Sequence, residues 1–241
     1  MKKNIKHKLP AYSILEHLSL NDDMLRQLQA CVKELDSEFV SVLEANKNLC
    51  GIHHQLAKDV YDNFFQVALT ESGSSKDVSM DICEDNFKEI HEGSATQSLR
   101  RKKYLSSQQD SSFNELSYSK KTPIYKKYQE TFDRILEPVK GKPTRIRLMR
   151  LAAGSNVPPH IDYDPSYAVR IIIPIFSPSE CVNLFWVKNE LQMQSFKPGR
   201  AYFLNTGYRH AVENRSNEDR YTMTITIDGT DDIEHIISSG T

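Results

Sequence analysis

AVRIIIPIF, residues 168–176, is a short run of β-branched and aromatic residues in which Arg170 is the only charge. Similar runs recur on both sides of it, separated by Gly, Pro, Asn and Ser: RIRLMRLA (145–152), CVNLFWV (181–187), LQMQSF (191–196), RAYFLN (200–205), YRHAVE (208–213) and RYTMTITID (220–228). Short strands punctuated by turn residues are typical of an antiparallel sandwich or barrel. The Cys-Trp-Cys pattern of an immunoglobulin-like sandwich is missing, so the sequence favours a double-stranded jelly roll over residues 144–241.

The N-terminal half reads differently, because its apolar residues recur at helical spacing. Three stretches are predicted to be helices: residues 21–45 behind an Asn21 or Asp22 cap, residues 54–70, and residues 125–136 behind Thr122-Pro123. We expect all three to pack an apolar face onto the barrel. The predicted fold class is therefore α+β, with a double-stranded β-helix (jelly roll, cupin-like) core and N-terminal helices packed on it.

Residues 71–122 separate the second and third predicted helices and are rich in Ser, Lys, Asp and Gln. So long a segment without strong periodicity is either a linker or surface loop, or a lid that covers a substrate. We therefore predict a helical N-terminal part with this long polar loop or lid, residues 1–143, and a jelly-roll catalytic core, residues 144–241. The two parts are expected to form one compact domain.

The composition limits which binding partners and which cellular compartment we expect. The formal net charge of −1 and the pI near 6.7 provide no broad cationic field, so we expect no nucleic-acid partner. Four scattered cysteines without a CxxC pair indicate neither a disulfide framework nor a thiolate zinc site. No apolar run reaches about 18 residues, and the basic N-terminus lacks a signal-peptide core. We expect a soluble, cytoplasmic protein without a membrane partner; its oligomeric state is left open.

The stretch VPPHIDYD, residues 157–164, places His160 and Asp162 two positions apart. Residues i and i+2 of an extended chain face the same side, so the imidazole and the carboxylate can meet at one point. A third donor is His210, fifty residues downstream in NTGYRHAVEN. Two imidazoles and one carboxylate leave adjacent positions open on a non-haem Fe(II), although zinc accepts the same donors. An HxD tripeptide also finishes ordinary turns, and it is the later histidine that favours a metal centre.

Arg220 lies ten residues after His210, and Thr222 follows it on the same face of a predicted strand. An arginine on the inner face of a barrel is costly unless it meets an anion, and its fork suits a carboxylate. Thr222 adds a hydroxyl donor. Arg170 is the only charge in its strand, so it too is expected to meet an anion if it is buried. The alternatives are an outward, solvated Arg220 and an edge-strand Arg170 paired with a surface acid.

Three residues beside the HxD pair are candidates for lining a substrate pocket: Tyr163, Asp164 and Tyr167. Asp164 stands before a proline and is equally an ordinary turn starter. The GxSxG, P-loop and GxGxxG motifs are missing from the sequence, so nothing supports nucleophilic, phosphoryl-transfer or dinucleotide chemistry.

The joint order of several motifs is more specific than any one of them. HxD comes first, then an apolar strand with one arginine, PG before an aromatic strand, HxVxN, and an arginine ten residues after the second histidine. In this order, residues 144–228 resemble the aspartyl/asparaginyl β-hydroxylase-like group of Fe(II)- and 2-oxoglutarate-dependent dioxygenases.

The resemblance implies three iron ligands: His160, Asp162 and His210. It also implies that Arg220, with help from Thr222, holds the distal carboxylate of 2-oxoglutarate, while Arg170 lies near the metal-binding end of this cosubstrate. Some relatives carry a histidine two residues after that arginine, where this chain has Ile172, so the resemblance does not fix the contacts around that carboxylate. Halogenating members of the wider superfamily replace the acid with a small residue, and retention of Asp162 therefore argues for hydroxylation.

The activity implied by the resemblance is hydroxylation of an unactivated C–H bond of an amino-acid side chain, free or in a peptide. Fe(II) is the implied cofactor and 2-oxoglutarate and O₂ are the cosubstrates, with release of succinate and CO₂. Two other classes remain open: a non-catalytic jelly-roll binding protein, and a cupin-like metal isomerase or hydrolase. Which amino acid or carbon is the target does not follow from the sequence.

Overall fold

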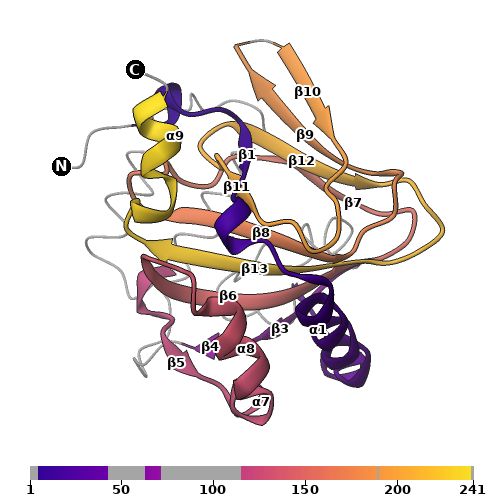
Figure 1. The fold of residues 1–241 in the computed structure, drawn as a ribbon. Coiled ribbons are helices and arrows are strands. Elements are labelled where there is room, and N and C mark those ends of the chain that lie inside the picture. The colour runs from indigo at the N-terminus through magenta and orange to yellow at the C-terminus, as the bar shows by residue number, and fades with distance from the viewer. Residues whose placement is uncertain (1–4, 43–62, 72–114, 189, 240–241) are drawn as a thin grey trace, which may run out of the picture.

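Two antiparallel sheets form the body of the protein (Figure 1). The computed structural model describes residues 5–42, 63–71, 115–188 and 190–239. Eight consecutive strands make the barrel: β6 (Lys142–Leu151), β7 (Asn156–His160), β8 (Val169–Phe176), β9 (Cys181–Val187), β10 (Glu190–Gln194), β11 (Tyr202–Leu204), β12 (Arg209–Asn214) and β13 (Arg220–Asp228). They divide between the sheets in the orders β11-β8-β13-β6 and β10-β9-β12-β7. This arrangement confirms the predicted jelly roll with helices around it.

Strand β13 illustrates how the sequence builds the larger sheet. Met223, Ile225 and Ile227 belong to the main hydrophobic core. Thr222 and Thr224, which alternate with them, are buried but polar. Because successive side chains of a strand point to opposite faces, the apolar residues face the packed outer side of the sheet and the threonines face the inside of the barrel.

Helix α1 (Asp22–Glu34) begins where the sequence predicts it, since the side chain of Asn21 accepts a hydrogen bond from the backbone N–H of Met24 at 2.9 Å. It ends at Glu34, and the chain continues into a 3-10 turn (Asp36–Glu38) and strand β2 (Val40–Ser41). The prediction of one continuous helix is therefore wrong from Leu35 to Ser41, and residues 43–45 lie outside the described residues.

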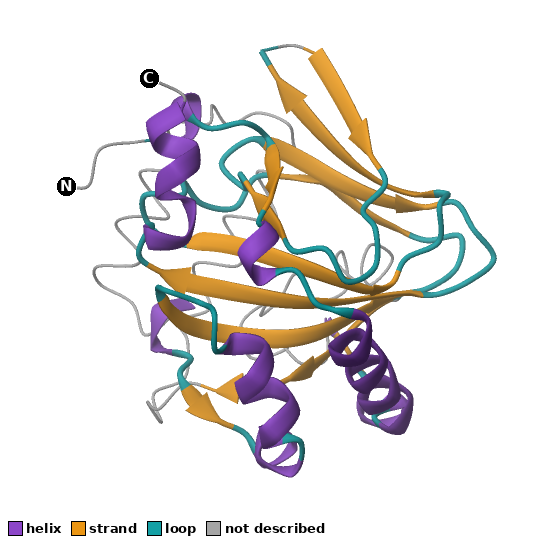
Figure 2. Ribbon diagram, viewed as in Figure 1, coloured by secondary structure: helices purple, strands orange, loops and turns teal. Residues whose placement is uncertain are grey.

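The third predicted helix is present as two short helices, α7 (Pro123–Lys127) and α8 (Gln129–Leu136). Thr122 caps α7 by accepting a hydrogen bond from the backbone N–H of Tyr125 at 3.2 Å. In Figure 2 these helices and α1 lie on the same side of the larger sheet, where Phe132 of α8 enters the core. None of the helices in the described part of the chain has the length and apolar character needed to cross a membrane.

The second predicted helix, residues 54–70, is wrong where the structure describes it. Phe64–Ala68 form strand β3, which pairs antiparallel with β6 in the larger sheet. Val67 is buried in the core while Gln66 is buried on the other face, which is a period of two. The open edge of β6 offers backbone hydrogen bonds that override the helical pattern. Residues 54–62 lie outside the described residues.

N-terminal residues also extend the opposite edge of the larger sheet. Strand β1 (Tyr12–Ile14) pairs antiparallel with β11. The part of the chain predicted to be helical, residues 1–143, therefore supplies strands beyond both edges of the jelly-roll sheet. The remaining short elements are the 3-10 turns Lys6–Lys8, Glu16–Leu18, Glu115–Ser117 and Asp231–Ile233 and the C-terminal helix α9 (Glu234–Ser239).

Only the ends of the predicted linker or lid, residues 71–122, are described. Strand β4 (Thr70–Glu71) pairs with strand β5 (Lys120–Lys121), so the two ends of the segment lie side by side. Residues 72–114 lie outside the described residues, and the choice between a loop and a lid stays a prediction.

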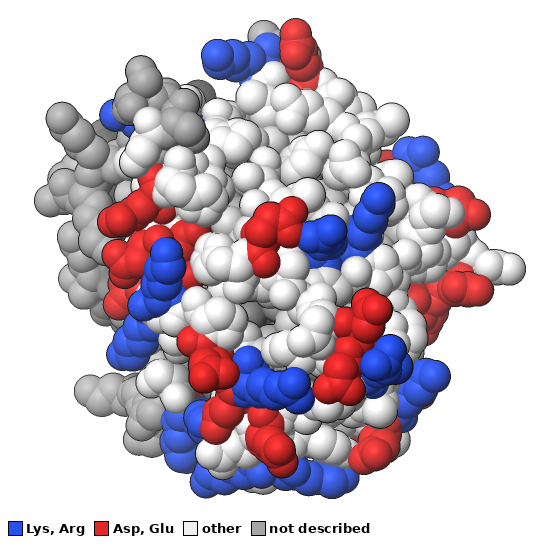
Figure 3. Space-filling model, in the orientation of Figure 1, with Lys and Arg blue, Asp and Glu red and all other residues white. Residues whose placement is uncertain are grey.

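Charges of both signs share the face of the molecule drawn in Figure 3, where Lys and Arg side chains lie next to Asp and Glu side chains. Among the described residues, exposed ion pairs include Arg200–Glu16 and Arg134–Asp23. Exposed pairs of this kind each contribute only about 0–1 kcal/mol, because solvent screens them. The stability of the fold therefore comes mainly from the core beneath.

The carboxylate of Asp133 on α8 gives the fold a pH-dependent contact. It accepts hydrogen bonds from the Lys121 ammonium at 2.7 Å and the Tyr125 hydroxyl at 2.6 Å, and these two contacts lower the pKa of Asp133 to about 2. A carboxyl with a lower pKa in the folded chain stabilises the fold above its unfolded pKa of about 3.9. That contribution is lost as the pH falls through the folded pKa.

We therefore expect Asp133→Asn to lower the free energy of unfolding at pH 7 by at most ~1 kcal/mol, since the side chain is 44 % exposed and screened. The difference from the parent protein should shrink as the pH falls from about 4 to about 2. Urea unfolding at a series of pH values measures it, with Glu130→Gln on the same helix as the control. A difference that stays constant down to the lowest pH contradicts the assignment.

Candidate metal centre

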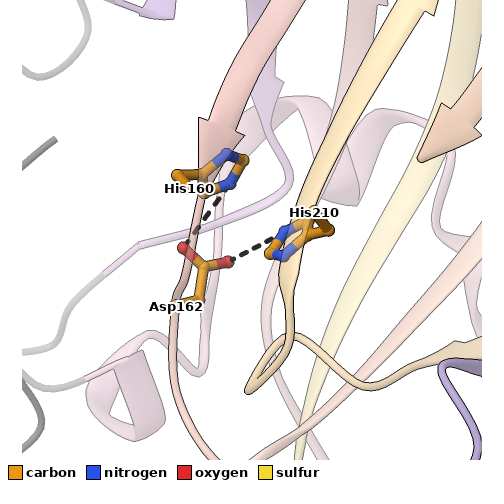
Figure 4. A group of neighbouring side chains, drawn as sticks. All are labelled: His160, Asp162 and His210. Atoms are coloured by element: carbon orange, nitrogen blue, oxygen red, sulfur yellow. Dashed lines mark ion pairs between the residues drawn. The ribbon is translucent and has the colours of Figure 1, made fainter. Parts of the chain in front are cut away.

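His160 and His210 lie opposite each other on neighbouring strands. His160 ends β7 and pairs in register with His210 of β12, and their ring centroids are 4.2 Å apart. Asp162 follows in the β7–β8 loop, where its backbone N–H donates to the Thr206 carbonyl at 3.0 Å. Figure 4 shows the two imidazoles and the carboxylate pointing toward one another. Ligand atoms of the three residues lie within 4.8 Å of one another.

Backbone carbonyls fix which nitrogen each imidazole presents to the centre. His160 Nδ1 lies 2.8 Å from the Pro158 carbonyl, and His210 Nδ1 lies 3.0 Å from the Tyr208 carbonyl. A carbonyl only accepts, so each Nδ1 carries a proton, and in the neutral form of each ring Nε2 keeps its lone pair. The Nε2 atoms face the Asp162 carboxylate at 3.7 Å and 4.0 Å. Two neutral imidazoles and a carboxylate in this geometry fit a divalent cation.

The protonation states also suit a metal site. Burial lowers the pKa of His210 to about 4, with the neighbouring His160 acting in the same direction. Desolvation raises the pKa of Asp162, but the imidazoles and two nearby guanidinium groups outweigh it and bring the pKa to about 2. A neutral imidazole and an ionised carboxylate are the forms that bind metals. The Asp162 side chain is 33 % exposed, so an ion can reach it.

Arg170 faces the same centre from the larger sheet. Strand β8 lies between β11 and β13, so the alternative of an edge-strand arginine is wrong. The guanidinium is buried, and its Nη2 lies 3.9 Å from an Asp162 carboxylate oxygen. Its Nε and Nη2 also donate to the Tyr163 hydroxyl at 2.9 Å and 2.5 Å. Arg170 is thus held beside the three candidate ligands.

Arg220 opens strand β13 and is only 5 % exposed, so the alternative of an outward, solvated arginine is wrong. Its Nη2 donates to the Asn183 side-chain oxygen at 3.3 Å. The Nε atom is buried without a hydrogen-bond partner, and among the described residues no acid forms an ion pair with this guanidinium. Burial lowers the pKa of Arg220. Thr222 follows on the same inner face and is 4 % exposed, so cation and hydroxyl are buried on one face of the strand.

Asp164 has the contacts of a turn and cap residue. Its carboxylate accepts hydrogen bonds from the backbone N–H groups of Ile5, Lys6 and Ser166 at 3.0–3.2 Å. The Lys6 ammonium in turn donates to the Gly207 carbonyl at 3.0 Å. The N-terminal segment is therefore tied both to the loop after His160 and to the loop before His210. Of the two interpretations of Asp164, the structure favours the turn starter.

The two neighbouring tyrosines differ in their surroundings. Tyr163 is 4 % exposed and directs its hydroxyl at Arg170. Tyr167 is half-buried and packs its ring edge-on against that of Tyr163, with centroids 5.4 Å apart. Contact of either ring with a substrate stays a prediction.

Two residues of the site escaped the sequence analysis. Asn183 orients its amide by donating from Nδ2 to the Gln194 carbonyl at 3.2 Å, which turns its oxygen toward Arg220. Arg147 of β6 helps to lower the pKa of Asp162 and donates to the Gln66 side chain at 3.3 Å. A signal existed for Arg147, since it is a charged residue alternating with apolar ones in a predicted strand.

Solved structures show distant likenesses. An oxidoreductase of the 2OG-Fe(II) oxygenase family from Burkholderia pseudomallei is 12 % identical, with 68 % of this chain and 66 % of that chain covered and a TM-score of 0.36. A cupin domain from Bordetella pertussis Tohama I is 15 % identical, with 38 % and 88 % covered and a TM-score of 0.30. Oxalate oxidase in complex with the substrate analogue glycolate is 18 % identical, with 34 % of this chain but only 41 % of the oxidase covered and a TM-score of 0.29.

Comparison by sequence gives a family. No curated protein matches the chain. The family model described as aspartyl/asparaginyl beta-hydroxylase matches residues 30–229, a range that contains both candidate histidines, Asp162, Arg170 and Arg220. The match extends over most of the chain and agrees with the resemblance of residues 144–228. The chain belongs to the aspartyl/asparaginyl β-hydroxylase family.

Proposed function

We propose that the protein is an Fe(II)- and 2-oxoglutarate-dependent dioxygenase. Its reaction hydroxylates an unactivated C–H bond of an amino-acid side chain, free or within a peptide, and releases succinate and CO₂. The observation that carries the proposal is the convergence of the three candidate ligands beside Arg170. A second buried arginine, Arg220, has an Nε without a hydrogen-bond partner. Membership of a hydroxylase family supports the same reaction.

The three candidate ligands would hold Fe(II) on one side. His160, Asp162 and His210 supply two imidazoles and one carboxylate, the donor set of non-haem iron oxygenases. The bound iron would supply the capacity to activate O₂ for attack on a C–H bond. The chain's own part is to keep both Nε2 atoms unprotonated through the carbonyl contacts at Nδ1.

The larger sheet would bind 2-oxoglutarate. Arg220 suits its distal carboxylate, because the guanidinium is buried and its Nε lacks a partner. Thr222 stands two residues further along the same face, and the Asn183 oxygen holds one guanidinium nitrogen in place. Arg170 lies nearer the candidate ligands and suits the other carboxylate. A dicarboxylate would therefore meet a cation at each end.

An apolar wall backs this site on the smaller sheet. Phe185 of β9 is 1 % exposed and stacks on the His210 ring, with centroids 6.3 Å apart and an interplanar angle of 23°. Phe185 also packs with Phe196 and Tyr202 in a second, smaller core. These rings keep water away from one side of the centre and strengthen the electrostatic contacts there.

The test is turnover by the full chain with Fe(II), O₂ and 2-oxoglutarate. We expect slow, substrate-independent formation of succinate, and faster formation with the correct substrate. Mass spectrometry of a panel of free amino acids and peptides identifies that substrate by a gain of one oxygen. Protein loaded with Zn(II) is the control, since zinc accepts the same donors without redox chemistry.

Two results contradict the proposal and identify the other classes. Metal-dependent conversion of a substrate without 2-oxoglutarate indicates a cupin-like isomerase or hydrolase. Failure of the protein to bind either Fe(II) or 2-oxoglutarate by calorimetry indicates a non-catalytic jelly-roll protein.

A further inference from the structure

The Tyr163 hydroxyl and the Arg170 guanidinium form a tight, buried contact. The hydroxyl lies 2.9 Å from Nε and 2.5 Å from Nη2 of Arg170, and the guanidinium carbon lies 5.2 Å from the centroid of the tyrosine ring. Tyr163 is 4 % exposed and Arg170 is 8 % exposed. A phenol oxygen that accepts from two nitrogens of one guanidinium fixes both the position and the plane of the fork.

The backbone around Tyr163 is fixed as well. Its carbonyl accepts a hydrogen bond from the Thr206 hydroxyl at 3.0 Å, and its own hydroxyl lies 3.4 Å from the Thr226 hydroxyl on β13. The backbone carbonyl of Thr206 also accepts from the N–H of Asp162 at 3.0 Å. One threonine therefore holds both the candidate ligand Asp162 and the tyrosine that follows it.

The orientation of the Arg170 side chain matters for binding, because the guanidinium must be ordered before it can hold a carboxylate. An arginine side chain has many rotamers, and ordering it costs up to ~2 kcal/mol if binding must do so. The contact with Tyr163 orders the Arg170 fork before any ligand arrives, with Nη2 already 3.9 Å from the Asp162 carboxylate. Preorganisation of this kind raises affinity by removing the cost of ordering.

We propose that Tyr163 is a positioning residue that acts through Arg170 to fix the metal-side carboxylate of the cosubstrate. It thereby joins cosubstrate binding to the loop that carries Asp162. The inference rests on the proposed function and deepens it. Tyr163 does not react itself; it orders the guanidinium, while its neighbour in the chain contributes the carboxylate ligand.

The test compares binding of 2-oxoglutarate to the parent protein and to Tyr163→Phe, both loaded with Mn(II) and studied by calorimetry. We expect about tenfold weaker binding of 2-oxoglutarate, the usual effect of losing a hydrogen bond to a charged group. The affinity for Mn(II) itself should stay within about twofold, which also shows that the variant is folded. Tyr128→Phe, which removes a hydroxyl bound to Glu34 on the outer helices, is the matched control.

A double-mutant cycle shows whether Tyr163 acts through Arg170. In an Arg170→Met background, adding Tyr163→Phe should weaken 2-oxoglutarate binding by less than about twofold, because the group that the tyrosine orders is gone. In turnover, Tyr163→Phe should raise the KM for 2-oxoglutarate more than it lowers kcat. Equal losses in both backgrounds overturn the inference, as does an unchanged affinity of the single variant.

The outcome also separates this inference from the proposed function. A parent protein that binds Mn(II) but not 2-oxoglutarate overturns both. A parent protein that binds 2-oxoglutarate as tightly as Tyr163→Phe overturns the role of Tyr163 and leaves the proposed function standing.

Discussion

Replacing His210 with alanine is expected to lower the affinity for Fe(II) by more than about 100-fold and to abolish the formation of succinate. Altering partners behind a metal ligand typically costs about 10–100-fold in affinity, and losing the ligand itself costs more. His210 is 7 % exposed and directs Nε2 toward the shared centre, so alanine leaves that position without a ligand from the protein.

Metal titration followed by a succinate assay measures both effects. His235→Ala, which removes a histidine of helix α9 whose ring lies 6.2 Å from that of His17, is the matched control. A His210→Ala protein that retains full turnover excludes the proposed metal centre. If Fe(II) binding is lost but 2-oxoglutarate still binds without metal, the arginines bind the cosubstrate independently of the metal ligands.

Replacing Arg220 with methionine is expected to weaken 2-oxoglutarate binding by about 100-fold while leaving metal affinity nearly unchanged. Removing one partner of a buried charge pair costs ~2–5 kcal/mol, and Arg220 is only 5 % exposed. Lysine keeps the charge but not the two-pronged geometry. The 2-oxoglutarate affinity of Arg220→Lys should therefore fall between those of the parent protein and Arg220→Met. Calorimetry with Mn(II)-loaded protein measures the series, and exposed Arg215→Met is the control.

The same substitution separates a binding arginine from a structural one. A structural arginine stabilises the fold, so its removal lowers the melting temperature. Arg220 has a buried Nε without a partner, and an apolar residue of similar volume is often neutral or stabilising at such a place. Arg220→Met without cosubstrate should therefore melt at the same or a higher temperature. A marked drop in melting temperature contradicts the interpretation of Arg220 as a binding residue.

The local part of the candidate site was predictable from the sequence. His160 and Asp162 are two residues apart, and this spacing places them on the same side of an extended chain. The pairing of His210 with His160 was not predictable by spacing alone, because it depends on the register of two strands separated by fifty residues. The motif order, rather than any periodicity, linked them.

The main error in the fold shows where periodicity fails. Phe64–Ala68 is an apolar window of five residues, too short to distinguish a helix from a strand. Its state is decided by the neighbouring edge of β6, which lies some eighty residues later. Asn183 was missed for a related reason: an amide in a strand indicates function only once its neighbour, Arg220, is known.

The tie between the N-terminus and the ligand loops bears on the order in which the protein folds. Ile5 contacts Asp164 across 159 residues of sequence, and the Lys6 ammonium contacts Gly207 across 201. Contacts between such distant parts of a chain form slowly, because closing large loops has an entropic cost before any contact compensates for it. We expect the candidate ligands to reach their final geometry late in folding, after the N-terminus has returned to the barrel.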